Sequence, residues 1–131
     1  MRPVVIDASA LAAIVFDEPG SERLARRLEG ETVFAPTLLK FELANVAWKK
    51  IRRGAREAPA ILQTLLKVLG PRGSITWMDV DHADVALVAI ETGLSSYDAS
   101  YLWLAGSLGA DLVTLDTRLA RASERLGNPA S

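Results

Sequence analysis

Four acidic residues stand where their carboxylates could act together. Asp7 and Asp116 each follow an apolar run typical of a buried strand, VVI and LVTL, and each precedes a helical segment. Asp98 opens another helical segment, after GLSSY. Glu42 lies inside a long helical segment, where it cannot serve as an N-cap. Carboxylates brought together in this way repel one another unless a cation neutralises them.

Carboxylates are ligands for hard divalent cations. Mg²⁺ typically uses one or two of them while keeping water and binding substrate phosphates. Two such ions about 4 Å apart can activate a water and stabilise the leaving oxygen in phosphodiester hydrolysis. Thiolate sites are excluded because the chain has no cysteine, and its single histidine argues against a zinc hydrolase. The acids therefore indicate oxygen-ligated metal chemistry, on the condition that the fold brings them together.

Each acid also has an ordinary structural interpretation. Aspartate is a favoured helix N-cap, which contributes about 1 kcal/mol, and an acid there suits the helix dipole. That role would account for the three aspartates taken singly. Glu42 could instead form a salt bridge with Lys49 or Arg53, or stand half-exposed at a rim. Both interpretations remain open at this point.

The elements that would position these acids alternate along the chain. Short apolar strands separated by helical segments predict an α/β fold, with a mainly parallel sheet of four to five short strands flanked by helices. The carboxyl ends of parallel strands are where such sheets bind ligands. The predicted strands span 3–7, 32–36, 74–80 and 111–116, and the predicted helices span 21–29, 37–53, 57–69, 81–92, 98–108 and 117–127, with a first helix from residue 8 that breaks at Pro19.

The helix predicted at 37–53 is apolar on more than one side. This pattern indicates burial against both the domain and another surface. At 100° per residue, one arc contains Leu39, Leu43, Ala44, Ala47 and Ile51, and a second contains Phe41 and Trp48.

Composition places the chain among ordinary globular proteins. Its 131 residues predict one domain, 1–131, with 50% hydrophobic and 24% charged residues. We expect a cytoplasmic protein with no membrane contact, because no apolar stretch reaches the roughly 18–20 residues of a membrane span and no signal peptide is recognised. A net charge of −1 argues against a basic DNA-coating protein.

Basic residues nevertheless gather locally, and arginine predominates among them. These groups are either solvated helix faces or a track for phosphates, for which the planar guanidinium is well suited. The groups are Lys49, Lys50, Arg52, Arg53 and Arg56; Arg23, Arg26 and Arg27; and Arg118, Arg121 and Arg125.

Four segments together resemble the sequence signature of PIN domains. They are VVIDASAL near the start, ELANV from Glu42, YDASYLWLA from Tyr97 and LVTLDTRL near the end. The chain in particular resembles the small VapC ribonuclease toxins of bacterial and archaeal toxin–antitoxin pairs. The similarity covers essentially the whole chain, with the segments in the usual order.

The resemblance implies a PIN-like three-layer fold and a metal-dependent ribonuclease. By this similarity Asp7, Glu42, Asp98 and Asp116 form a pocket for Mg²⁺ or Mn²⁺, and a metal-activated water cleaves RNA. The resemblance also implies a VapB-type antitoxin whose tail blocks the acidic groove. A homodimer is implied as well, and a heterotetramer or larger assembly with the antitoxin.

Three polar residues are expected to support the pocket. Ser9 and Thr114 match hydroxyl positions often found beside it in the family, but they could equally bond the local backbone. Asn45 falls one helical turn after Glu42 and is expected to reach the same rim.

Other functions remain as alternatives. A PIN-domain housekeeping nuclease or a non-catalytic PIN-like module for RNA or protein binding would share the fold. A phosphoaspartyl signalling domain would want paired acids after the first strand, and a haloacid-dehalogenase-type phosphatase would want Asp-x-Asp there. Asp7 is followed by Ala8 and Ser9, which disfavours both.

Overall fold

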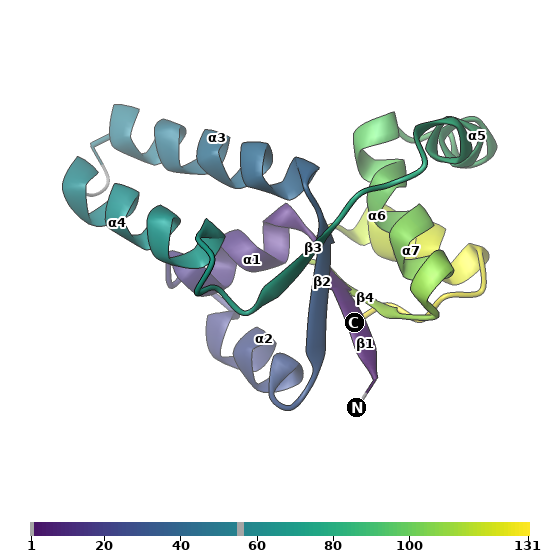
Figure 1. Ribbon diagram of the computed structural model, residues 1–131, viewed down its shortest axis with the longest axis horizontal. Coiled ribbons are helices and arrows are strands. Elements are labelled where there is room, and N and C mark those ends of the chain that lie inside the picture. The colour runs from purple at the N-terminus through teal and green to yellow at the C-terminus, as the bar shows by residue number, and fades with distance from the viewer. Residues whose placement is uncertain (1, 55–56) are drawn as a thin grey trace.

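A parallel β-sheet between two layers of helices forms the centre of the computed structural model, which describes residues 2–54 and 57–131 (Figure 1). The four strands lie in the order β3-β2-β1-β4, and each neighbouring pair is parallel. Figure 1 shows α1 to α4 on one side of the sheet and α5 to α7 on the other. The expected three-layer α/β fold is confirmed, with four strands.

The elements follow the predicted order along the chain. The last strand is three residues shorter than expected, because the backbone leaves the sheet at Thr114, whose side chain accepts a hydrogen bond from the Asp116 amide. The strands are β1 (Pro3–Ile6), β2 (Thr32–Pro36), β3 (Ile75–Met78) and β4 (Asp111–Val113), and the helices are α1 (Ala8–Val15), α2 (Ser21–Leu28), α3 (Leu38–Arg52), α4 (Ala58–Leu69), α5 (His82–Thr92), α6 (Ser96–Leu108) and α7 (Thr117–Arg125).

The central strand β1 is buried on both of its faces. Val4, Val5 and Ile6 have no exposed surface, which explains why this strand is continuously apolar instead of alternating. β1 pairs with β2 on one side and with β4 on the other. Its carboxyl end therefore lies next to that of β4, and a side chain placed there has a rigid support.

Helix α3 has the two kinds of apolar surface that its sequence predicts. Leu39, Leu43 and Ala47 are buried in the core, whereas Phe41 and Trp48 are 79% and 50% exposed. The second apolar arc therefore faces solvent, with the Arg52 guanidinium 4.8 Å from the centre of the Trp48 ring. Within the described segments, no helix combines the length and the apolar character needed to cross a membrane.

Candidate active site

The four acids predicted from the sequence approach one another at one edge of the sheet. Asp7 follows β1 and Asp116 lies just beyond β4, while α6 carries Asp98 and α3 carries Glu42. Their charges interact: Asp98 and Asp7 both raise the pKa of Glu42, and Asp116 raises the pKa of Asp7. Segments up to about a hundred residues apart in sequence thus supply one acidic cluster.

Asp7 is the most buried acid of the cluster, with 5% of its surface exposed. It is the N-cap of α1, since its Oδ1 accepts a hydrogen bond of 3.0 Å from the Ala10 amide. Burial raises the pKa of Asp7, and hydrogen bonds from Thr114, Ala10 and Ser9 oppose this shift. The capping interpretation is confirmed for Asp7. However, the free-energy cost of burying a carboxylate exceeds the stabilisation that an N-cap provides, so capping alone does not explain a buried acid here.

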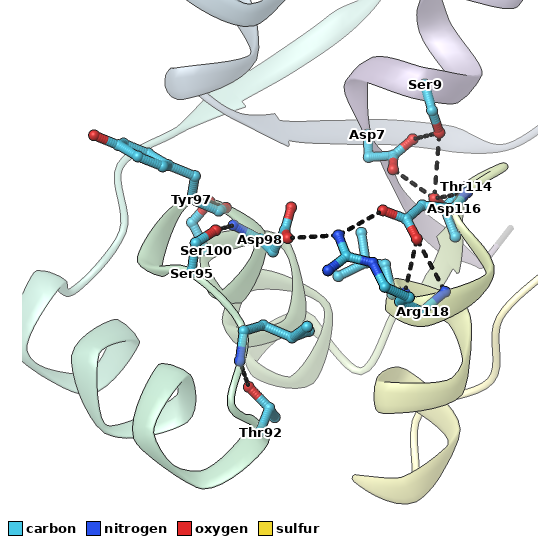
Figure 2. Close-up of polar contacts among 12 residues, drawn as sticks. Asp7, Ser9, Thr92, Ser95, Tyr97, Asp98, Ser100, Thr114, Asp116 and Arg118 are labelled. Carbon is cyan, nitrogen blue, oxygen red and sulfur yellow. Dashed lines mark hydrogen bonds and ion pairs between the residues drawn. The ribbon is translucent and has the colours of Figure 1, made fainter.

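Ser9 and Thr114 hold the Asp7 carboxylate between them (Figure 2). The Ser9 hydroxyl donates to Asp7 Oδ1 at 2.7 Å, and the Thr114 hydroxyl donates to Oδ2. Ser9 Oγ also accepts from the Leu115 amide at 2.9 Å, and Thr114 Oγ1 accepts from the Asp116 amide at 2.9 Å. Each hydroxyl therefore bonds both the backbone and an acid, and together they tie the start of α1 to the end of β4.

Glu42 is oriented by a buried tyrosine. The Tyr101 hydroxyl donates to Glu42 Oε1, and only 2% of Tyr101 is exposed. Burial is the main reason that the pKa of Glu42 is raised, while the Tyr101 hydrogen bond lowers it. Burial and the neighbouring Glu42 charge also raise the pKa of Tyr101, which keeps its hydroxyl protonated as a donor. The alternative salt bridge from Glu42 to Lys49 or Arg53 is absent, and all three residues are described.

Asp98 is not the residue that caps its helix, and in this respect the capping interpretation is wrong. Helix α6 begins two residues earlier than predicted, at Ser96, and its N-cap is Ser95. The Ser95 hydroxyl accepts a hydrogen bond of 3.1 Å from the Asp98 amide. A serine hydroxyl satisfies the orphan amide, so the Asp98 carboxylate is free to face the other acids.

Asp116 caps α7 with one oxygen and faces the cluster with the other. Its Oδ1 accepts from the amides of Arg118 at 2.9 Å and Leu119 at 3.3 Å. Its Oδ2 lies 3.4 Å from a guanidinium nitrogen of Arg118, and the same nitrogen lies 3.5 Å from Asp98 Oδ2. Figure 2 shows the Arg118 guanidinium between the two carboxylates.

The donor set of the cluster suits a hard divalent cation. All four acids offer oxygen ligands, and Mg²⁺ prefers oxygen ligands. Nowhere in 2–54 or 57–131 do three acidic or histidine side chains already stand close enough to coordinate one ion. A cation between Asp98 and Asp116 would take the place now held by Arg118. The acids converge, therefore, but the side chains must shift to form a complete coordination sphere.

Three further residues bear on the site. Asn45 is exposed on α3 and forms no hydrogen bond with any of the four acids, all of which are described. The sequence pattern does not single out Tyr101, although it stands one helical turn after Asp98. Arg118 was recognised only as part of a basic group, although it stands two residues after Asp116. These spacings do not reveal the contacts of Tyr101 with Glu42 and of Arg118 with Asp98, because the contacts depend on how the helices pack in the fold.

The chain is similar in sequence to a known domain family and to known nucleases. The profile of the PIN domain matches residues 4–125. Ribonuclease VapC3 of Pyrobaculum aerophilum is 33% identical over 130 residues, which cover 96% of this chain and 98% of that protein. Exonuclease VapC9 of the same organism is 34% identical over 115 residues, which cover 88% of this chain and 81% of that protein.

Solved structures show the same fold. A crystal structure of a Pyrobaculum aerophilum protein aligns with a TM-score of 0.75 at 31% identity, over 98% of this chain and 83% of the other. The VapBC2 complex of Rickettsia felis, bound to a DNA fragment from its promoter, aligns with a TM-score of 0.66 at 14% identity. That alignment covers 98% of this chain and 97% of the other, and it bears on the fold alone.

Proposed function

Because this chain belongs to the PIN domain family, we propose that it is a ribonuclease that depends on Mg²⁺ or Mn²⁺ and acts as the toxin of a toxin–antitoxin pair. The observation that carries the proposal is the convergence of Asp7, Glu42, Asp98 and Asp116 at the carboxyl ends of β1 and β4. The curated relatives that share about a third of its residues are named as nucleases, which supports the same reaction class.

The four acids would hold the ion, and the residues around them would fix the acids. A bound divalent ion supplies an activated water and neutralises charge on the leaving oxygen in phosphodiester hydrolysis. Ser9 and Thr114 fix both oxygens of Asp7, and Tyr101 fixes one oxygen of Glu42. Asp7 and Glu42 are therefore already oriented, whereas Asp98 and Asp116 would have to release Arg118 before all four acids could hold the ion.

Hydrolysis with a water as the nucleophile and the 3′-oxygen as the leaving group would leave a 5′-phosphate and a 3′-hydroxyl. The site needs no protein nucleophile, in keeping with a chain that has no cysteine. RNA would be drawn to the site by the arginine and lysine side chains on the surrounding helices, so that binding weakens as salt increases. The proposed activity belongs in the cytoplasm, where RNA targets are found.

Whether cleavage begins inside the RNA or at its end is a separate question. The proposal is an endonuclease, whereas one relative is named an exonuclease. A circular RNA distinguishes the two, because it offers no end. Linearisation of the circle supports the endonuclease, and cleavage of linear RNA alone would favour an exonuclease.

We also propose two protein partners. A VapB-type antitoxin would cover the acidic groove. The proposal is supported by the fold that this chain shares with the VapBC2 complex. A second copy of this chain would cover the exposed arc of α3, where Phe41 and Trp48 leave apolar surface in water. With the antitoxin, such a dimer would form a heterotetramer or a larger assembly.

The proposed activity is tested with purified protein and labelled total RNA. We expect fragments with Mg²⁺, and none with EDTA or with Asp98→Asn. Equal cleavage under all three conditions would exclude a metal-dependent nuclease at this site. A PIN-like module without catalytic activity would bind RNA and leave it intact under every condition.

A further inference from the structure

Arg118 places a positive charge inside the acidic cluster. One of its guanidinium nitrogens lies 3.4 Å from Asp116 Oδ2 and 3.5 Å from Asp98 Oδ2. The helix cap occupies the other oxygen of Asp116, so Oδ2 is the atom that this acid has left for a cation. Arg118 therefore contacts an oxygen that a divalent ion would need.

The Arg118 side chain can leave this position at little cost. It is 67% exposed, so it moves into solvent without disturbing the core. Both of its contacts are longer than the 2.7–2.9 Å of a strong charge-assisted hydrogen bond. Exposed ion pairs of this kind contribute little to stability. The contact is therefore weak enough to exchange for another.

A divalent ion and the Arg118 guanidinium exclude each other from this place. An ion held by both Asp98 and Asp116 would need the Oδ2 atoms that the guanidinium now contacts. Its charge would also repel the guanidinium. The release is local, because the backbone of Arg118 stays bonded to Asp116 through its amide.

We propose that Arg118 is a positioning residue that alternates between two anionic partners. Without a divalent ion it bridges Asp98 and Asp116 and offsets the repulsion between their charges. With the ion bound it turns outward and binds a phosphate of the RNA next to the bond to be cleaved. The guanidinium fork suits both a carboxylate and a phosphate, and α7 keeps the side chain at the rim in either state. This inference rests on the proposed metal-dependent ribonuclease.

Metal binding without RNA tests the first half of the exchange. Mn²⁺ binding is measured by calorimetry or electron paramagnetic resonance for the wild type, Arg118→Gln and Arg118→Lys. Arg118→Gln removes the guanidinium that forms ion pairs with Asp98 and Asp116. We therefore expect this variant to bind Mn²⁺ about 3- to 10-fold more tightly than the wild type. Arg118→Lys keeps the charge and is expected to bind Mn²⁺ as the wild type does.

Arg121 provides a matched control for this titration. It is exposed on the same helix, one turn further on, and no ion pair is found for it among the described residues. Arg121→Gln removes the same charge from α7 and is expected to leave Mn²⁺ affinity within 2-fold of the wild type. An equal gain in Arg121→Gln and Arg118→Gln, or no gain in either, would overturn the proposal.

RNA cleavage tests the second half. At saturating metal, Arg118→Gln is expected to raise KM for RNA about 10-fold or more while kcat changes less, and Arg118→Lys is expected to restore part of the loss. An unchanged KM in Arg118→Gln would contradict the proposal that Arg118 binds an RNA phosphate when the metal ion is bound. The proposed function fails in a different way: a wild type that binds no Mn²⁺ would contradict the metal site itself, and with it this inference.

Discussion

Asp7 and Asp116 each begin a helix with one carboxylate oxygen and still contribute to the acidic cluster. In Asp7 the Ala10 amide and the Ser9 hydroxyl share Oδ1, and Thr114 donates to Oδ2. In Asp116 the cap uses Oδ1 and leaves Oδ2 beside Arg118. The two roles are compatible because a carboxylate has about four lone-pair sites. Capping preference in the sequence is therefore no argument against a role in the site.

Asp7→Asn is expected to stabilise the metal-free protein by on the order of 1 kcal/mol near neutral pH, because it removes a buried charge. The raised pKa of Asp7 means that the folded chain holds this proton more tightly than the unfolded chain. Stability of the wild type therefore falls as pH rises from the ordinary aspartate value through the raised pKa, and the variant lacks this loss.

Denaturant unfolding in EDTA between pH 4 and 8 measures this effect. The free energy of unfolding of Asp7→Asn should exceed that of the wild type by an amount that grows as pH rises toward the raised pKa of Asp7 and then levels off. Asp79→Asn, at an exposed position, serves as the control and should follow the wild type. A variant less stable than the wild type at pH 7.5 would show that the hydrogen bonds to Asp7 outweigh its burial.

Tyr101→Phe tests how Glu42 is kept ionised. The Tyr101 hydrogen bond lowers the pKa of Glu42, so its removal raises that pKa further. Because an ionised Glu42 is the form that binds metal, the acid limb of the pH profile of kcat/KM should move to higher pH at subsaturating Mg²⁺. Tyr97→Phe, at an exposed position of the same helix, should not move it. An unshifted acid limb in Tyr101→Phe would remove Glu42 from the groups that control activity.

At the scale of the elements, helix α6 shows how local capping serves the site. Ser95 caps the helix, so Asp98 stands in its first turn with a carboxylate that takes no part in the cap and faces Arg118. Ser95→Ala is expected to cost about 1 kcal/mol of stability and to lower activity several-fold, because the turn that carries Asp98 frays. Ser96→Ala, which removes an exposed hydroxyl without a cap role, is the control for thermal melting. Equal melting temperatures for the two variants would contradict this cap assignment.

Much of the element pattern could be predicted from the sequence, because it depends on local signals. The continuous apolar run of β1 indicated burial on both faces, and the structure confirms it. Helix α6 begins two residues before its predicted start, because Ser95, Ser96 and Asp98 are all acceptable N-caps and only the backbone decides among them. Strand β4 also ends before its predicted end, because the apolar pattern continues past the last residue paired in the sheet.

At the scale of the whole molecule, the sequence alone could not show that the four acids meet. Periodicity predicts strands but not their order, and Asp7 lies beside Asp116 only because β4 pairs with β1. The resemblance to PIN domains gives no strand order, but it implies that the four acids form one pocket. It did not supply Arg118 and Tyr101, whose contacts depend on how the side chains of α7 and α6 meet the acids.

Assembly is predicted at the same scale. Phe41→Asp is expected to leave the fold intact, since Phe41 is 79% exposed, and to convert the proposed homodimer to a monomer. Sedimentation measures the change, with Leu66→Asp on α4 as a control of similar exposure. A wild type that sediments as a monomer at high concentration would contradict the proposed dimer.

The most direct test of the central claim is the cleavage rate of one labelled RNA at saturating Mn²⁺ or Mg²⁺. We predict that Asp7→Asn, Glu42→Gln, Asp98→Asn and Asp116→Asn each lower the rate at least about 100-fold, because a metal site contributes several kcal/mol to such a reaction. Glu91→Gln, at an exposed position of α5, should keep the wild-type rate. Wild-type rates in the four site variants would contradict the claim that these carboxylates form one catalytic metal site.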